Sequence, residues 1–96
     1  MNQALSIVQS HSFRKAVKKL HKNQKTDLDN AIRAIADDPN LGIQKVGDLS
    51  SVRVYKFKMV KQLTLLAYQI DDGQLVLTLL MIGTHENFYR DVKLIL

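Results

Sequence analysis

The fold class is decided by LTLLAYQI-DDGQ-LVLTLLMI, the stretch from Leu63 to Ile82. Its two almost wholly apolar runs, residues 63–70 and 75–82, are typical of strands that are covered on both faces of a sheet. The four residues between them, Asp71 to Gln74, have the composition of a hairpin turn, and Gly73 can adopt the positive φ that such turns require. The stretch therefore predicts an antiparallel pair of buried strands.

A third strand is expected directly before this pair, over residues 52–60. Alternate residues of a strand point to opposite faces of the sheet. One face of this strand therefore carries Val52, Val54, Lys56 and Lys58, and the other carries Arg53, Tyr55, Phe57 and Met59. Together the three strands predict an antiparallel meander in the second half of the chain.

The first half of the chain has the periodicity of helices. Apolar residues recur at i, i+3, i+4 and i+7 in two sets, Phe13, Ala16, Val17, Leu20 and Leu28, Ala31, Ile32, Ile35. Thr26 followed by Asp29 is a weak capping box that would start the second helix. Asp38 ends that helix, because the residue before a proline avoids the helical region. The two sets predict a helical hairpin.

Two short elements complete the expected order. Residues 5–9 can form a strand before the helices, and a short helix can run from Glu86 to the C-terminus. The order β-α-α-β-β-β plus helix predicts an α+β fold, in which the helical hairpin packs on one face of a twisted, mainly antiparallel four-stranded sheet. With 96 residues and no repeat or linker, the chain is expected to form one domain, residues 1–96.

Composition excludes several classes of protein. Hydrophobic residues make up 46% of the chain, which is incompatible with disorder throughout. Without cysteine there is no disulfide framework, iron–sulfur cluster or cysteine zinc site. The N-terminus lacks the pattern of a secretory signal, and the apolar run 75–82 is too short to span a bilayer. We therefore expect a small cytoplasmic protein with no membrane partner.

The formal net charge of +5 is concentrated in two basic blocks. One lies on the first helix, mostly off its apolar stripe, and consists of Arg14, Lys15, Lys18, Lys19 and Lys22. The other lies on the 52–60 strand and the residue after it, with no acidic residue between positions 51 and 68, and consists of Arg53, Lys56, Lys58 and Lys61. Such blocks suit a surface that binds a polyanion, or equally a solvated helix face and an edge strand that resists aggregation.

The candidates for chemistry are few. His11, His21 and His85 share no metal-ligand spacing, and no G-x-S-x-G turn or phosphate-binding glycine loop is present. We therefore expect neither a metal nor a cofactor. His85 differs from the other two because it follows directly on the last predicted strand, where a side chain can reach a cleft at the end of the sheet.

His85 has company that suits metal-free RNA cleavage, namely Tyr89, Arg53, Lys56 and Lys58. In that reaction a 2′-hydroxyl attacks the adjacent phosphate, an acid and a base move protons, and cations stabilise the growing charge. Histidine suits proton transfer because its pKa lies near neutral pH, and tyrosine can stack on a base. Alternatively, His85 simply starts the last helix, and Tyr89 helps to close the core.

Three segments carry a resemblance to a known family. They are Gly47-Asp48-Leu49, the strand Leu65–Ile70 and above all the closing stretch Gly83–Asp91, GTHENFYRD. With these segments the chain resembles the RelE/ParE superfamily of toxins from bacterial type II toxin–antitoxin systems, in its RelE/YafQ-like branch. The resemblance implies a RelE-like fold and an mRNA interferase that cleaves ribosome-bound message. It also implies that a cognate antitoxin silences the protein.

The same resemblance assigns roles to the closing stretch. YafQ-like toxins end in Gly-Thr-His with an aromatic residue four positions on, and that pattern matches Gly83, Thr84, His85 and Tyr89. His85 would be the general acid or base, and Tyr89 would contact the substrate. This chain departs from the pattern because no histidine lies between His21 and His85. Lysines stand in that region instead, so the identity of the base is open.

Two other functions stay open at this point. The ParE branch of the superfamily inhibits DNA gyrase without being a nuclease, and a basic module that binds RNA or protein needs no toxicity at all. If the chain is a nuclease, its expected partners are a cognate antitoxin, the ribosome and mRNA. The residues expected to contact rRNA or the antitoxin are Arg14, Lys15, Lys18, Lys19 and Lys22. Because these are basic, we expect an acidic antitoxin segment that folds on binding.

Overall fold

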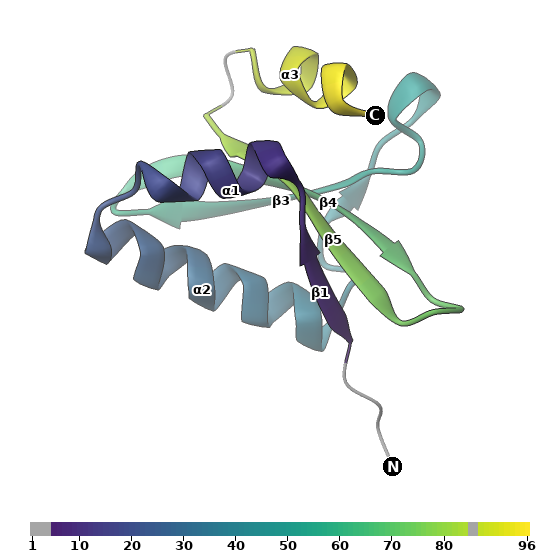
Figure 1. Ribbon diagram of the computed structural model, residues 1–96, viewed down its shortest axis with the longest axis horizontal. Coiled ribbons are helices and arrows are strands. Elements are labelled where there is room, and N and C mark those ends of the chain that lie inside the picture. Colours follow the sequence, from purple (N-terminus) through teal and green to yellow (C-terminus); the bar gives the residue numbers. More distant parts are fainter. Residues whose placement is uncertain (1–4, 85–86) are drawn as a thin grey trace.

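A computed structural model describes residues 5–84 and 87–96, and its elements confirm the predicted α+β class (Figure 1). In chain order these are β1 (Ser6–Gln9), α1 (His11–Lys18), α2 (Lys22–Asp37), β2 (Ile43–Gln44), the 3₁₀ turn η1 (Gly47–Leu49), β3 (Arg53–Met59), β4 (Gln62–Asp71), β5 (Val76–Gly83) and α3 (Phe88–Ile95).

The sheet of the described chain has five strands in the order β1-β5-β4-β3-β2. The strand β1 runs parallel to β5, and the other neighbours are antiparallel. The prediction of four strands was therefore wrong by one strand. The missing strand, β2, pairs Ile43 with Val54 and Gln44 with Arg53. Two residues are too few to show an alternating pattern, so the sequence gives no sign of this strand.

Both faces of the sheet are covered. The hairpin of α1 and α2 covers one face, which we call the hairpin face, over a buried cluster that includes Phe13, Leu28, Ile35, Leu66 and Tyr68 (Figure 1). The other face, the α3 face, carries a second cluster that includes Val52, Val54, Leu65, Phe88 and Val92. The two-sided burial explains why β4 and β5 read as continuous apolar runs.

A bulge in β5 shifts the register of its pairing with β4 by one residue. The register pairs Ala67 with Met81 but Tyr68 with Leu79, so Leu80 is an extra residue on β5. Leu80 is buried in the α3-face cluster. Its carbonyl oxygen accepts a hydrogen bond of 2.6 Å from the hydroxyl of Ser10, which also caps α1 by accepting from the Phe13 amide.

The second helix begins earlier than the sequence indicated. It starts at Lys22 rather than near Thr26, and the side chain of Gln24 accepts a hydrogen bond of 2.7 Å from the His21 amide at its N-terminus. The capping box at Thr26 was wrong, because Thr26 lies within the helix and its hydroxyl donates to the Lys22 carbonyl. The predicted end before Pro39 is confirmed, since α2 ends at Asp37.

The two hairpin turns hold residues with positive φ that are not glycine. In the 72–75 turn the positive φ falls on Leu75 (55°) and not on Gly73, so the role expected for Gly73 was wrong. The turn between β3 and β4 consists of Val60 (φ 48°) and Lys61 (φ 70°), the combination that a type I′ turn requires. Residues other than glycine and asparagine adopt this left-handed backbone conformation at a cost of roughly 1–2 kcal/mol each.

Candidate functional site

Lys56 and Lys58 project from β3 onto the α3 face of the sheet. They alternate with Tyr55 and Phe57, which pack on the hairpin-face cluster, and both lysines are exposed. The register places Lys56 opposite Leu65, and Leu65 opposite Gly83 at the end of β5. Two strand spacings therefore separate Lys56 from Gly83, about 10 Å between their Cα atoms.

The end of β5 leads into the predicted catalytic segment. A Cβ on Gly83 would lie 3.4 Å from Cδ1 of Phe88, so this glycine lets the first residue of α3 pack closely on the strand. Asn87, before the helix, has a left-handed φ of 63°. His85 and Glu86 lie outside the described residues, so the catalytic role of His85 stays a prediction.

Tyr89 is held on the same face by contacts from two sides. Its ring lies edge-on to Phe88, with centroids 5.3 Å apart, and packs against the α3-face cluster. The ammonium nitrogen of Lys45 lies 4.9 Å from the centroid of the Tyr89 ring. Nothing in the sequence singles out Lys45, because no motif links the connection after β2 to a helix that begins 43 residues later. The α3 face thus combines an aromatic ring with cations from two elements.

Arg53 lies on the opposite face from Lys56 and Lys58. One guanidinium nitrogen, Nη1, donates to the carbonyls of Gly42 (2.8 Å) and Asn40 (3.5 Å), and Nη2 donates to the side chain of Gln44 (3.4 Å). The sequence groups Arg53 with the two lysines as candidate catalytic residues, but strand alternation puts it on the other face of β3, as the sequence pattern also indicates. The structure uses Arg53 to hold the loop after α2.

Tyr68 anchors the same loop from beneath. Its hydroxyl donates to the Pro39 carbonyl (2.6 Å) and accepts from the Gly42 amide (2.9 Å), and the side chain is fully buried. Burial raises the pKa of Tyr68, while the Gly42 hydrogen bond and the Arg53 charge oppose the shift. A Cβ at Gly42 would lie 2.6 Å from the tyrosine oxygen, so only glycine fits there.

The five basic residues predicted to contact rRNA or an antitoxin are all exposed. They lie on α1, at its C-cap and at the first residue of α2. They are Arg14, Lys15, Lys18, Lys19 and Lys22. This surface belongs to the hairpin layer, whereas Lys56 and Lys58 lie on the α3 face. The cations of α1 and the two lysines Lys56 and Lys58 are therefore on opposite sides of the sheet, whereas Arg53 of the second basic block lies on the hairpin side.

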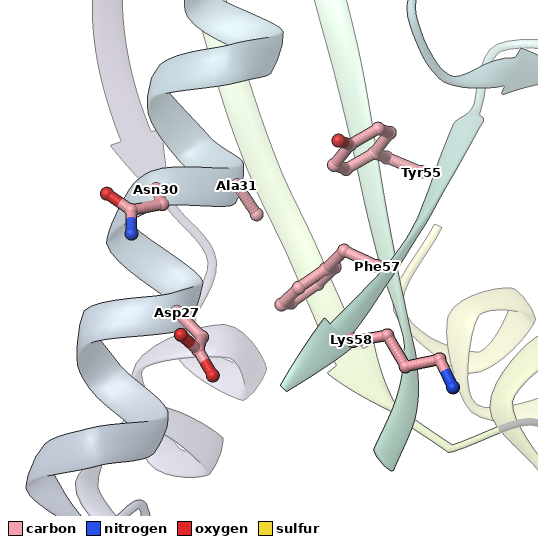
Figure 2. A pocket seen from close by; sticks show the side chains of 6 residues that line it. All are labelled: Asp27, Asn30, Ala31, Tyr55, Phe57 and Lys58. Carbon is pink, nitrogen blue, oxygen red and sulfur yellow. The ribbon is translucent and has the colours of Figure 1, made fainter. Parts of the chain in front are cut away.

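Two of the hollows formed by the described residues lie between the helices and the sheet on the hairpin side. One, of about 200 Å³, lies between α2 and β3 and is lined by Asp27, Asn30, Ala31, Tyr55, Phe57 and Lys58. Figure 2 shows that Asp27 and Ala31 project from α2 toward β3, while Asn30 points away from β3 and Lys58 points away from α2. The second, about 230 Å³, lies between α1 and the end of β5; Ala16, Leu20, Met59, Ile82 and Gly83 are among the residues that line it.

Within residues 5–84 and 87–96, no group of three or more histidine, aspartate or glutamate side chains could hold a metal ion. In the same part of the chain, no helix has the length and apolar character that crossing a membrane requires.

Comparison with known proteins identifies the family. The model of the ParE-like toxins of type II bacterial toxin–antitoxin systems matches residues 7–93. The chain therefore belongs to this toxin family. No curated protein sequence matches it.

Solved structures show the same fold. A chain of the intact E. coli RelBE toxin–antitoxin complex superposes with a TM-score of 0.69 at 20% identity, covering 86% of this chain and 99% of that one. A chain of the RelBE2 toxin–antitoxin complex of Mycobacterium tuberculosis gives 0.70 at 15% identity, with 86% and 100% covered. The conserved hypothetical protein HP0892 of Helicobacter pylori gives 0.57 at 24% identity, with 84% and 94% covered.

Proposed function

We propose that this toxin is an mRNA interferase, an endoribonuclease that cleaves ribosome-bound mRNA without a metal ion. The observation that carries the proposal is the α3 face of the sheet. Exposed Lys56 lies in register with the strand end at Gly83, and exposed Lys58 is two residues further along the same face of β3. Tyr89 lies on the same face, with the Lys45 ammonium over its ring. His85 follows Gly83 by two residues. We propose that these cations, this aromatic ring and His85 act together on one phosphate.

The chemistry follows from the substrate itself. The 2′-oxygen of a ribose attacks the adjacent phosphorus and loses its proton to a base, the bond to the 5′-oxygen breaks, and an acid protonates that oxygen. The products are a 2′,3′-cyclic phosphate and a 5′-hydroxyl. We assign charge stabilisation to Lys56 and Lys58, base stacking to Tyr89 and one proton transfer to His85. Arg53, tied to loop carbonyls on the other face, is assigned to the scaffold.

The partners of this activity follow from the two basic surfaces. The exposed cations of α1 suit rRNA phosphates, which would supply affinity while the message supplies the scissile bond. The similar RelE chains are known from RelBE toxin–antitoxin complexes. We therefore propose that this chain also has a cognate antitoxin, with an acidic segment that covers basic residues. Action on translating ribosomes places the protein in the cytoplasm.

The test is induction of the toxin in cells, followed by mapping of message 5′ ends. The variants are His85→Ala and the double variant Lys56→Ala/Lys58→Ala, for which we expect cleavage to fall by about 10²-fold or more. The control is Lys25→Ala/Arg33→Ala, which removes two exposed cations from α2 and leaves the α3 face intact. Toxin that is treated with EDTA and desalted before it is added to cell-free translation should cleave as fast as untreated toxin, because the proposed site holds no tightly bound metal. Wild-type cleavage by His85→Ala would overturn the assigned mechanism.

One alternative function is compatible with membership of a ParE-like toxin family. It is the inhibition of DNA gyrase. This alternative needs no proton-transfer residue. It predicts growth arrest with a DNA damage response, no new message 5′ ends, and full toxicity of the His85→Ala variant. The same induction experiment therefore separates the two functions.

A further inference from the structure

We infer that Asp27 is a positioning residue, which holds the tip of the β3–β4 hairpin and thereby the cations of β3. The inference rests on the proposed function. A carboxylate oxygen of Asp27, Oδ2, accepts a hydrogen bond of 2.8 Å from the amide of Val60, across 33 residues of sequence. The bond joins the helix layer to the turn of the hairpin, and Figure 2 shows Asp27 projecting from α2 toward β3.

The hairpin tip needs such a tie because its backbone is strained. Val60 and Lys61 both have positive φ, 48° and 70°. Turns of this type favour asparagine and glycine, and a β-branched residue in the left-handed region is a clear outlier. Val60 is 42% exposed, so it is not held in this conformation by full burial in a core cluster. The strain is held by the strand pairing of Met59 with Gln62 and by the bond from Asp27.

The strained tip lies next to the proposed site. Lys58 is two residues before Val60 and pairs with Leu63, just beyond the turn. Lys56 lies one further alternation along the same face. A change in the turn would rotate or shift this end of β3, because a two-residue loop transmits its geometry directly to the strands that it joins. Asp27 therefore fixes where the β3 cations stand without touching the substrate.

Charge makes the tie stronger than a neutral bond. A carboxylate that accepts from a backbone amide forms a charge-assisted hydrogen bond, and Asp27 is half-buried beside the stacked rings of Tyr55 and Phe57. The bond itself is exposed to solvent, so its strength comes from the charge and not from exclusion of water. The sequence contains a matched residue, Asp29, which is exposed two positions further along α2. It offers the same charge without the link to the turn.

The experiment compares Asp27→Ala, Asp27→Asn, Asp29→Ala and the double variant Asp27→Ala/Val60→Gly, each made by cell-free synthesis of the full chain. Hydrogen exchange measures the tip, and cleavage of a translated message measures the site. For Asp27→Ala we expect the Val60 amide to exchange about tenfold faster or more, because it loses a bond to a charged group. Cleavage should fall by a similar factor. The Asp27→Asn variant keeps an acceptor oxygen, so its exchange rate and its cleavage should lie between those of the wild type and of Asp27→Ala.

The double variant makes the test specific. Glycine adopts positive φ without strain, so Asp27→Ala/Val60→Gly should recover most of the cleavage that Asp27→Ala loses, while Asp29→Ala should match the wild type. The inference is overturned if Asp27→Ala exchanges and cleaves like Asp29→Ala, or if Val60→Gly restores nothing. If the wild-type chain itself cleaves no message, the proposed function fails, and the exchange rates alone still decide whether Asp27 holds the tip.

Discussion

Tyr68 is fully buried, and its hydroxyl makes two hydrogen bonds to the backbone of a distant loop. Its hydroxyl links the carbonyl of Pro39 to the amide of Gly42, two residues that lie 29 and 26 positions earlier in the sequence. The guanidinium of Arg53 holds the carbonyl of the same glycine. One buried phenol thus fixes the loop that leads from α2 into β2, and with it the edge of the sheet beside the α3 face.

Replacement of Tyr68 by phenylalanine should cost about 1–3 kcal/mol of the free energy of unfolding at neutral pH, because the Gly42 amide loses its acceptor. The raised pKa of Tyr68 gives this difference a pH dependence. Its contribution is complete below the unfolded pKa of about 10 and is lost as pH rises through the higher folded value. Urea unfolding should therefore show a gap between wild type and variant that narrows in alkali. A constant gap would contradict the assignment.

The elements are joined at one point by a single serine. Ser10 caps α1, and its hydroxyl donates to the carbonyl of Leu80 at the bulge of β5. This one side chain therefore caps the first helix of the hairpin layer and also ties the start of that helix to β5. The extra residue shifts the alternation of β5, so that Ile82 lies in the hairpin-face cluster with Leu77 and Leu79, while Leu80 is buried in the α3-face cluster.

Ser10→Ala should destabilise the fold by about 1–2 kcal/mol, because it removes a helix cap and leaves the Leu80 carbonyl without the hydroxyl. Ser12→Ala, two residues further on in α1, is the control and should lie within about 0.5 kcal/mol of the wild type. Thermal or urea unfolding measures both. Equal loss in the two variants would show that the cap is not what matters.

The whole molecule separates its charge into two surfaces. The cations of α1 lie on the hairpin layer, and Lys56 and Lys58 of β3 lie on the α3 face. In the proposed function the first surface binds rRNA and the second binds the scissile phosphate. Binding and cleavage should therefore respond to different substitutions.

Replacement of Lys15, Lys18, Lys19 and Lys22 by glutamine should weaken cosedimentation with ribosomes and reduce its dependence on salt. Each lost phosphate contact lowers the slope of log affinity against log salt by about 0.7–0.9. Lys56→Ala/Lys58→Ala should instead reduce cleavage far more than binding. If the quadruple variant binds with the wild-type salt dependence, α1 is not the rRNA surface.

The sequence predicted the fold well where burial on two faces or a helical period left a clear pattern. The meander, the helical hairpin and the end of α2 before Pro39 follow from such patterns. Local turn chemistry misled at Gly73, because the four-residue turn puts its positive φ on Leu75. The two-residue strand β2 left no pattern to read.

For the candidate site, the sequence determined which residue types are present and which classes of chemistry they allow. The charges, the Gly-Thr-His segment with its aromatic residue and the absence of cysteine are all properties of the chain. Only the tertiary structure decided which distant residues come together. Packing of the chain joined Arg53 to carbonyls of the loop after α2, brought Lys45 to Tyr89 and tied Asp27 to a strained turn. These contacts join distant segments, so no local pattern could specify them.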